Sequence, residues 1–487
     1  MYFFDKFTIY GYIKTIFLKF YIERGQFNMI SMIGLILSLA LIIFLAYKGY
    51  STIITAPIVA LLTVLLIGGD SNTHLMVHYT EVYMGGFAGF VKNYFPIFLT
   101  GAIFAKLMEE ALYAKSIANF ITKNLGKDKT ILAVVLAGAI LTYGGVSLFT
   151  VAFVLYPIAN VLFKESNIPK RLIPGTIALG AFTFTMTALP GTPEIQNVIP
   201  MRYFGTDTFA APLIGVVASI LMLLLGLTWL TYRVRKAHSN SEGYGNYNIE
   251  DKSSENKNIP KILLAVTPIL IIFISNLFFS KVFYKLVDGS YLSKYNLVLD
   301  NVSGTWSVII SIVIAILFII LINFKKISNL NQVLNQGISN SFLPLLSSSA
   351  IVGYGSVIKS LPVFITLQSV ILNLSSNPII SEALSVNIIC GITASASGGL
   401  TITLDALAPT FISMSQALNI SPEIMHRIAS LASGGLDTLP HNGAVITTLA
   451  ICGLTHKDSY KDIFVTSVII PIFVTALIVI TTSILYT

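Results

Sequence analysis

The sequence predicts an all-α polytopic membrane protein made of two related halves, with re-entrant hairpins and broken helices. Three observations support this prediction. Only 11% of the 487 residues are charged, 55% are hydrophobic and the mean hydropathy is +0.81, whereas about a quarter of a soluble protein is charged. Apolar runs recur along the chain, which is the pattern of a multi-pass protein. Two Leu-Pro segments, 187–193 and 437–443, interrupt long apolar stretches near the ends of the halves.

Seven apolar runs have about the length that a bilayer core requires, or slightly less. They are 33–46, 53–67, 95–107, 209–232, 262–279, 306–324 and 463–486. The intervening stretches 130–200 and 379–455 are too polar, and too often broken by Gly, Ser, Thr and Pro, to be simple spans.

One long hydrophilic stretch, 233–261, separates the halves and is rich in Lys and Arg. Such a segment indicates a flexible cytoplasmic linker. The sequence therefore divides into an N-terminal extension at 1–28, a first membrane half at 29–232, the linker at 233–261, and a second half at 262–487.

The extension 1–28 mixes aromatic and basic residues and lacks the small-residue cleavage site of a signal peptide. We expect it to be a misassigned start, with translation beginning near Met29 or Met32. The alternative is an interfacial amphipathic helix.

The composition also excludes several classes of partner. The net charge of +8 comes from basic residues in short connections, where they orient helices, so we expect a lipid bilayer and no nucleic acid as partner. The two cysteines, Cys390 and Cys452, lie in apolar surroundings. They predict neither a disulfide framework nor a metal site, and we expect no cofactor.

The two halves share five landmarks in the same order. Each has a Gly-Gly pair flanked by Ser or Thr, a proline inside an apolar run, a polar turn with a second proline, a basic residue, and the Leu-Pro break. These are 142–147, Pro157, 166–169, Arg171 and 187–193, then 395–401, Pro409, 419–422, Arg427 and 437–443. Internal repeats are typical of carriers. We predict that 53–232 and 306–487 superpose with inverted topology, and that the Gly-Gly and Leu-Pro segments converge near the midplane.

The repeated segments predict a binding site for an anion. Gly-Gly permits the tight reversal of a re-entrant hairpin, and a Leu-Pro break frees backbone groups that only protein or a polar cavity can satisfy. Half-helix N-termini at such a break offer N–H donors to a carboxylate. A single Gly-Gly or Pro would more simply indicate a kink or close helix packing. The predicted substrate-binding residues are Thr142, Gly144, Gly145, Ser147, Thr187, Pro190, Gly191, Thr192, Ser395, Ser397, Gly398, Gly399, Thr401, Thr438, Pro440, His441 and Asn442.

Few ionisable residues occur in these regions, so each is a candidate for function. Asp437 is the first candidate for coupling to H⁺ or Na⁺, with an N-cap of the following half-helix as the alternative. Asp405 and Glu194 rank below it because they could face water. His441 could bind the substrate carboxylate, shuttle a proton, or be a structural histidine.

The break segments also carry a resemblance. Residues 171–196 (RLIPGTIALGAFTFTMTALPGTPEIQ) and 433–447 (SGGLDTLPHNGAVIT) closely resemble the gluconate permease (GntP) family, and the resemblance extends from about residue 32 to the C-terminus. It implies the inverted-repeat fold of the ion-transporter superfamily, a homodimer, and a transport domain that moves as an elevator against a scaffold. It also implies cation-coupled symport of small organic anions across the bacterial cytoplasmic (inner) membrane.

The second break departs from the sugar-acid members of that family. Segment 437–443 resembles the branch assigned to short hydroxy-acids such as 3-hydroxybutyrate, which makes gluconate a weaker expectation. Arg171 and Arg427 precede the breaks by several helical turns, so we expect both near the membrane faces and predict a monocarboxylate.

Three alternatives remain at the level of sequence. A Na⁺/H⁺ antiporter of the same superfamily would exchange cations without an organic anion. An intramembrane aspartyl hydrolase would use Asp405 and Asp437, although neither an H-E-x-x-H nor a G-x-S-x-G motif occurs. A passive channel would not accumulate its substrate.

Overall fold

A computed structural model describes residues 31–486 apart from short gaps. The gaps are 32, 43, 46–47, 49, 68–73, 127–128, 147, 246–258, 328, 365–374, 394 and 441. The predicted extension at 1–28 lies outside the described residues, as do Ser147 and His441 of the predicted site. All the regular elements that the structure describes are helical.

Six helical segments of the described chain are long and apolar enough to cross a membrane. They are Leu75–Glu110, Pro212–Ser239, Ile262–Leu286, Leu299–Asn323, Leu330–Ser360 and His456–Tyr486. The protein is therefore an all-helical, multi-pass membrane protein, as predicted. Five of the six segments overlap apolar runs seen in the sequence, and the runs 33–46 and 53–67 fall on the shorter helices Ile33–Ile42 and Thr52–Ile67. The sequence analysis missed Leu330–Ser360.

The first half has a hairpin followed by a broken helix. Its elements are α2 (Thr52–Ile67), α3 (Leu75–Val77), η2 (His78–Tyr83), α4 (Met84–Glu110), α5 (Tyr113–Leu125), α6 (Thr130–Tyr143), α7 (Leu148–Glu165), η4 (Lys170–Leu172), α8 (Ile173–Ala181), α9 (Phe184–Thr187), α10 (Ile195–Phe204) and α11 (Pro212–Ser239). Helices α6 and α7 form the hairpin. The Leu-Pro break separates α9 from α10, and the long helix α11 follows.

The second half repeats that order. Its elements are α12 (Ile262–Phe278), η5 (Phe279–Phe283), α13 (Tyr284–Leu286), η6 (Ser290–Tyr295), α14 (Leu299–Asn323), α15 (Leu330–Ser360), α17 (Pro378–Thr393), α18 (Ala396–Ala417), α19 (Pro422–Ser433), η7 (Leu436–Thr438), α20 (Gly443–Cys452), α21 (His456–Phe464), η8 (Val465–Ile469) and α22 (Ile470–Tyr486). Here α17 and α18 are the hairpin, the break lies between α19 and α20, and α21 to α22 form the final long span.

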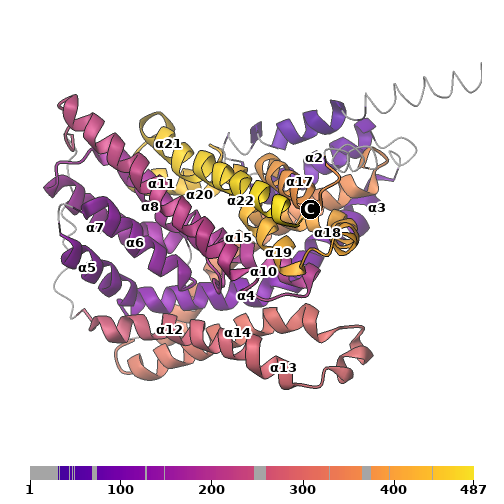
Figure 1. The fold of residues 1–487 in the computed structure, drawn as a ribbon, viewed down its shortest axis with the longest axis horizontal. Coiled ribbons are helices and arrows are strands. Elements are labelled where there is room, and N and C mark those ends of the chain that lie inside the picture. The colour runs from indigo at the N-terminus through magenta and orange to yellow at the C-terminus, as the bar shows by residue number, and fades with distance from the viewer. Residues whose placement is uncertain are drawn as a thin grey trace, which may run out of the picture.

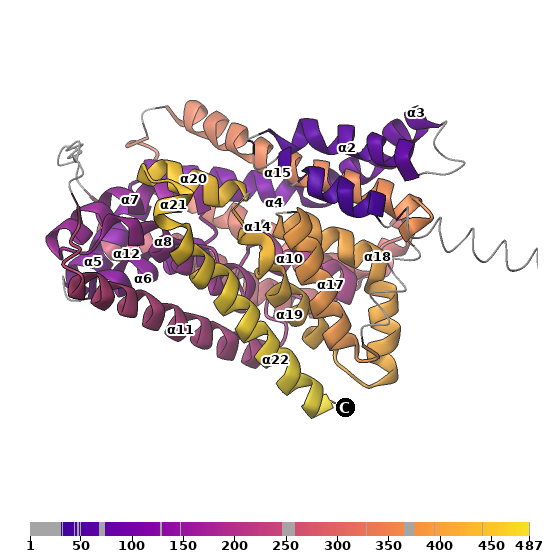
Figure 2. The ribbon, with the colours of Figure 1, turned by 90° about the horizontal axis from the view of Figure 1, so that it is seen from above.

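Two apolar cores hold these elements together. The larger core joins the helices from α4 through α11 with the second half of the chain. The smaller core packs Leu35, Ile42 and α2 against α15. Helices α4 and α15 pack along each other (Figure 2). Helices α12 and α14 pack together along one edge of the molecule (Figure 1). Burial of apolar area stabilises these contacts by about 25 cal/mol per Å².

An ionic cluster joins the end of α11 to the start of the last span. Arg233 Nε donates to Asp462 Oδ1 at 2.7 Å, and Arg171 Nη1 donates to Asp462 Oδ2 at 3.3 Å. Asp462 is fully buried, so this pairing compensates its charge. Because α22 also packs on α11 (Figure 1), the two long helices run antiparallel.

Arg171 also binds the connection that follows α11, because its Nε donates a hydrogen bond to Glu242 Oε1 at 2.6 Å. These hydrogen bonds lower the pKa of Glu242 below its ordinary value of 4.5. A depressed carboxyl pKa stabilises the fold above the ordinary value, and that contribution is lost as the pH falls through the lowered pKa.

Close contact between α6 and α8 depends on a glycine. A Cβ at Gly180 would lie 2.5 Å from the carbonyl oxygen of Val135. We expect Gly180→Ala to lower the free energy of unfolding by about 1–3 kcal/mol, because backbone must move to admit the methyl group. Thermal unfolding in detergent measures this. The matched control is Gly85→Ala in α4, where nothing lies within 4 Å of the added Cβ. Equal melting temperatures for both variants would contradict the contact.

Candidate functional site

The first break is an ordered loop. The chain leaves helix after Thr187 and resumes it at Ile195. Gly191 has φ +84° and its added Cβ would lie 2.6 Å from the Phe209 ring, so only glycine fits. Asn197 Nδ2 donates to the carbonyls of Thr192 and Thr208, both at 2.9 Å. A side chain of the protein therefore provides hydrogen-bond donors to backbone carbonyls that have left the helix.

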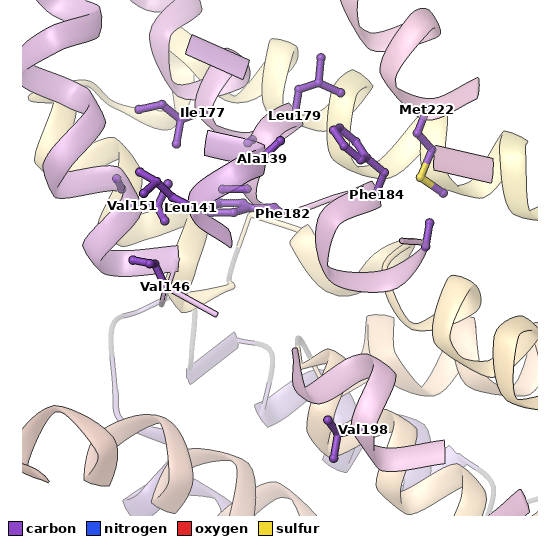
Figure 3. Packing of buried hydrophobic residues seen from close by; sticks show 14 of the residues in the cluster. Ala139, Leu141, Val146, Val151, Ile177, Leu179, Phe182, Phe184, Val198 and Met222 are labelled. Atoms are coloured by element: carbon purple, nitrogen blue, oxygen red, sulfur yellow. The ribbon is translucent and has the colours of Figure 1, made fainter. Parts of the chain in front are cut away.

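The first Gly-Gly loop, 142–147, lies against this break. The hydroxyl of Tyr143 donates to the carbonyl of Pro190 at 2.8 Å, and an added Cβ at Gly145 would lie 3.2 Å from Pro193. The Thr142 hydroxyl is buried and has no hydrogen-bond partner among the described residues. Figure 3 shows Leu141, near the end of α6, beside Val151 of α7, with Val146 of the loop close by.

The second break has a 3-10 turn, η7, in place of the regular helix. Thr438 Oγ1 donates to the carbonyl of Ser467 at 2.9 Å, and Tyr460 donates to the carbonyl of Thr438 at 3.2 Å. Asp437 in the same turn is 9% exposed, and its Oδ1 has no partner within the described part of the chain. Asn442 caps α20 by accepting from Ala444 N at 2.7 Å, so Asp437 is not the N-cap of the following half-helix.

The second Gly-Gly segment differs from the first. Gly398 and Gly399 lie in the first turn of α18, whereas Gly144 and Gly145 follow the end of α6. Ser395 is the N-cap of α18, accepting from Gly398 N at 3.1 Å. The glycine pair 398–399 therefore lies just after the reversal between α17 and α18, whereas Ser395 of the same segment lies at it. Ser397 is hydrogen-bonded to Ser348 of α15 at 2.8 Å, and the buried Thr401 hydroxyl has no partner among the described residues.

Helices α19 and α17 connect the two breaks and the second Gly-Gly segment. Ser430 Oγ donates to the carbonyl of Thr187 at 2.8 Å, which joins the first break to α19 just before the second break. Added Cβ atoms show two further close approaches, Gly391 to Leu436 at 2.6 Å and Gly399 to the Cα of Cys390 at 2.5 Å. Helix α17 thus touches both the second break and the second Gly-Gly segment.

Arg427 is fully buried in the protein interior. Its Nε and Nη2 donate to the carbonyl of Ala210 at 3.0 and 2.8 Å, and Nη1 donates to Asn197 Oδ1 at 3.0 Å. His426 extends this network to Asn197 and Thr206. A residue of the second half therefore holds the loop between α10 and α11 in the first half.

The two other candidate carboxylates, those of Asp405 and Glu194, differ from Asp437 in their exposure and in their hydrogen bonds. Asp405 is an exposed residue of α18 and accepts from the Tyr203 hydroxyl at 2.5 Å. Glu194 is half-buried at the start of α10, beside the first Gly-Gly loop, and its carboxylate forms no hydrogen bond with the described residues. Glu194 therefore combines proximity to a break with an unengaged carboxylate.

Three buried groups escaped the sequence analysis: the Asn197–His426–Arg427 network, Asp462 and Glu382. Glu382 lies inside a largely apolar segment, which is the signal that could have identified it. Asp462 lies in the polar segment His456–Phe464 and gave no such signal. No group of three His, Cys, Asp or Glu residues suited to a metal ion occurs in the ranges that the structure describes.

Two interrupted helices joined to buried polar loops, in an all-helical membrane protein, define the class of carriers. The comparisons with known proteins agree. The chain matches the model of the GntP family permeases over residues 30–485. It is 44% identical to an uncharacterized transporter of Bacillus subtilis (strain 168), YxjC, over 90% of this chain and 96% of that protein. It is also 28% identical to an uncharacterized transporter of Haemophilus influenzae, over 50% of this chain and 54% of that one.

The chain belongs to the GntP permease family, so it is a transporter and not an enzyme. The hydrolase alternative is thereby set aside.

Proposed function

We propose that this protein is a secondary active transporter of the bacterial cytoplasmic membrane, which couples H⁺ influx to uptake of a small organic monocarboxylate. The observation that supports it most is the pair of ordered breaks, each followed by a short helix whose N-terminus opens on the break. Such N-termini offer N–H donors and a partial positive charge to an anion.

An inverted repeat is part of the proposal. The polar turn of the first half lies at the linker end of α11, where Asn167 Oδ1 accepts from Tyr244 N at 3.1 Å. The equivalent turn of the second half lies at the other end, where Glu423 Oε2 accepts from Ala211 N at 3.2 Å. Helix α11 has 28 residues, or about 42 Å at 1.5 Å per residue. Equivalent turns at opposite ends of one long helix favour inverted halves. An elevator movement and a homodimer of such units, which the family resemblance implies, complete the proposal.

The engaged state of both arginines favours a single carboxylate. Arg427 is bonded to backbone carbonyls and Asn197, and Arg171 is bonded to Glu242 and Asp462. A second carboxylate on the substrate would need a cation to offset its desolvation. A short hydroxy-acid such as 3-hydroxybutyrate fits neutral donors better than citrate, and gluconate ranks behind it.

A ligand screen tests this choice. Purified protein is heated with a panel of small mono-, di- and tricarboxylates, with and without Na⁺, because a bound ligand raises the melting temperature. We expect the largest shift from a short hydroxy-acid, without a requirement for Na⁺. A shift with Na⁺ alone, and none with any carboxylate, would favour the antiporter.

A substitution in the second break tests the site itself. We expect His441→Ala to raise the apparent KM for the preferred substrate roughly tenfold to a hundredfold, because a hydrogen bond to a charged group contributes about 1.5–3 kcal/mol. Asn442→Ala should raise it as well, with an added loss of stability from the α20 cap. Initial uptake rates measure both. An unchanged KM in His441→Ala would remove this residue from the site.

A further inference from the structure

Helix α17 carries a buried acid that the transport site does not use. Glu382 has 0% exposure, and neither of its carboxylate oxygens has a hydrogen-bond partner among the described residues. The neighbouring serines do not supply one, since Ser385 Oγ donates to Ser381 O at 2.5 Å and Ser381 Oγ donates to Ser375 O at 2.7 Å. Glu382 is therefore an unpaired acid inside the protein.

None of the described elements that pack against α17 supplies a cation that pairs with Glu382. Helix α17 packs against α18, α19, η7 and α22. The titratable or charged residues on those elements are Asp405, Glu423, His426, Arg427, Asp437 and Tyr486, and α17 itself adds only Cys390. None of them forms a hydrogen bond or an ion pair with Glu382. Arg427, the one permanent cation among them, is bonded instead to Ala210, Thr208 and Asn197.

A bare carboxylate in these surroundings would be very costly, whereas the neutral acid costs far less. We propose that Glu382 is a proton-binding site of the transport cycle, loaded in the conformation described here and unloaded when α17 meets water. The O–H bond breaks on exposure, the proton goes to water, and the carboxylate takes a new proton from water on the other side of the membrane.

The position of Glu382 links its proton to the transport site. Nine residues further along α17, or about 13 Å, Gly391 packs against Leu436 beside Asp437. Asn387, between them, donates to the carbonyl of Ala432 at 3.0 Å. These contacts couple a movement of the second break to α17, the helix that carries Glu382. This inference depends on the proposed transport function, and it assigns a proton distinct from the cation that we expect at Asp437.

Reconstituted Glu382→Gln tests the proposal, with Asp437 intact. Substrate counterflow without a gradient should be retained, because glutamine mimics the neutral acid. Steady-state accumulation under an imposed pH gradient should fall about tenfold for each pH unit of the gradient, since one proton fewer accompanies each substrate and 1.4 kcal/mol is a factor of ten. Glu110→Gln, which makes the same change at an exposed position at the end of α4, should accumulate like the wild type. Full accumulation by Glu382→Gln would make Glu382 a permanently neutral structural residue.

A measurement on the wild type covers the case in which the variant does not fold. Dicyclohexylcarbodiimide reacts with protonated carboxyl groups in apolar surroundings, and mass spectrometry locates the product. We expect labelling of Glu382 that declines as the pH rises. Labelling that does not change with pH, or none at all in active protein, would overturn the proposal. Failure of the transport proposal gives a different result, which is the absence of carboxylate counterflow in the wild type.

Discussion

Asp437→Asn is expected to abolish most of the accumulation of substrate against a gradient while sparing part of substrate exchange, and only the proton proposed at Glu382 would drive what remains. Asparagine keeps the size of the side chain but cannot bind a proton or neutralise Na⁺. Asp437 is nearly buried in the second break, and its Oδ1 has no partner among the described residues, so it is poised to take up a cation. Because it lies at the proposed substrate site, its cation and the substrate would bind together. Proteoliposomes loaded for counterflow, and then for gradient-driven uptake, separate the two activities.

Glu110→Gln serves as the control for Asp437→Asn as well, and it should retain both activities. Concentrative uptake at the wild-type level by Asp437→Asn would remove Asp437 from the coupling role. That role would then pass to Glu194, whose carboxylate is unengaged, or to Asp405.

Replacement of Arg427 should cause the largest loss of stability. Arg427→Met leaves the carbonyls of Ala210 and Thr208 and the Oδ1 of Asn197 without this donor in the interior. Each buried acceptor left unpaired costs about 1–3 kcal/mol. We therefore expect little folded protein, and a strongly lowered melting temperature in what remains.

Arg427→Lys is the matched comparison, since it keeps the charge but cannot form the same fork of hydrogen bonds. Its melting temperature should lie between those of the wild type and Arg427→Met. If Arg427→Met melts like the wild type and only its substrate affinity falls, Arg427 faces the substrate and the argument for a monocarboxylate fails.

The sequence was sufficient to predict the helical, multi-pass fold because uninterrupted apolar runs mark spans. It failed at α15, Leu330–Ser360, whose first turns are rich in Asn and Gln and whose later turns contain Ser341, Ser348 and Ser349. These serines are buried, and Ser349 Oγ donates a hydrogen bond to the carbonyl of Leu345 within the same helix. Packing against α4 and α2 stabilises a helix that lipid alone would not favour.

The breaks were predictable because proline and glycine act locally. The hydrogen bonds that hold the loops around the first break were not predictable. Tyr143 reaches Pro190, and Arg427 reaches Ala210, across 47 and 217 positions of the chain. Such contacts depend on how the halves pack. For the same reason a count of residues could not show that the side chain of Arg427 is buried in the protein.

A flux measurement tests whether the protein couples a proton gradient to uptake of a monocarboxylate. Purified protein in proteoliposomes is given an inward proton gradient, and labelled 3-hydroxybutyrate, gluconate and citrate are compared at equal concentration. We expect uncoupler-sensitive accumulation of 3-hydroxybutyrate above its external concentration, with less accumulation of gluconate and none of citrate. Transport of citrate in preference to every monocarboxylate, or cation exchange without movement of any carboxylate, would contradict it.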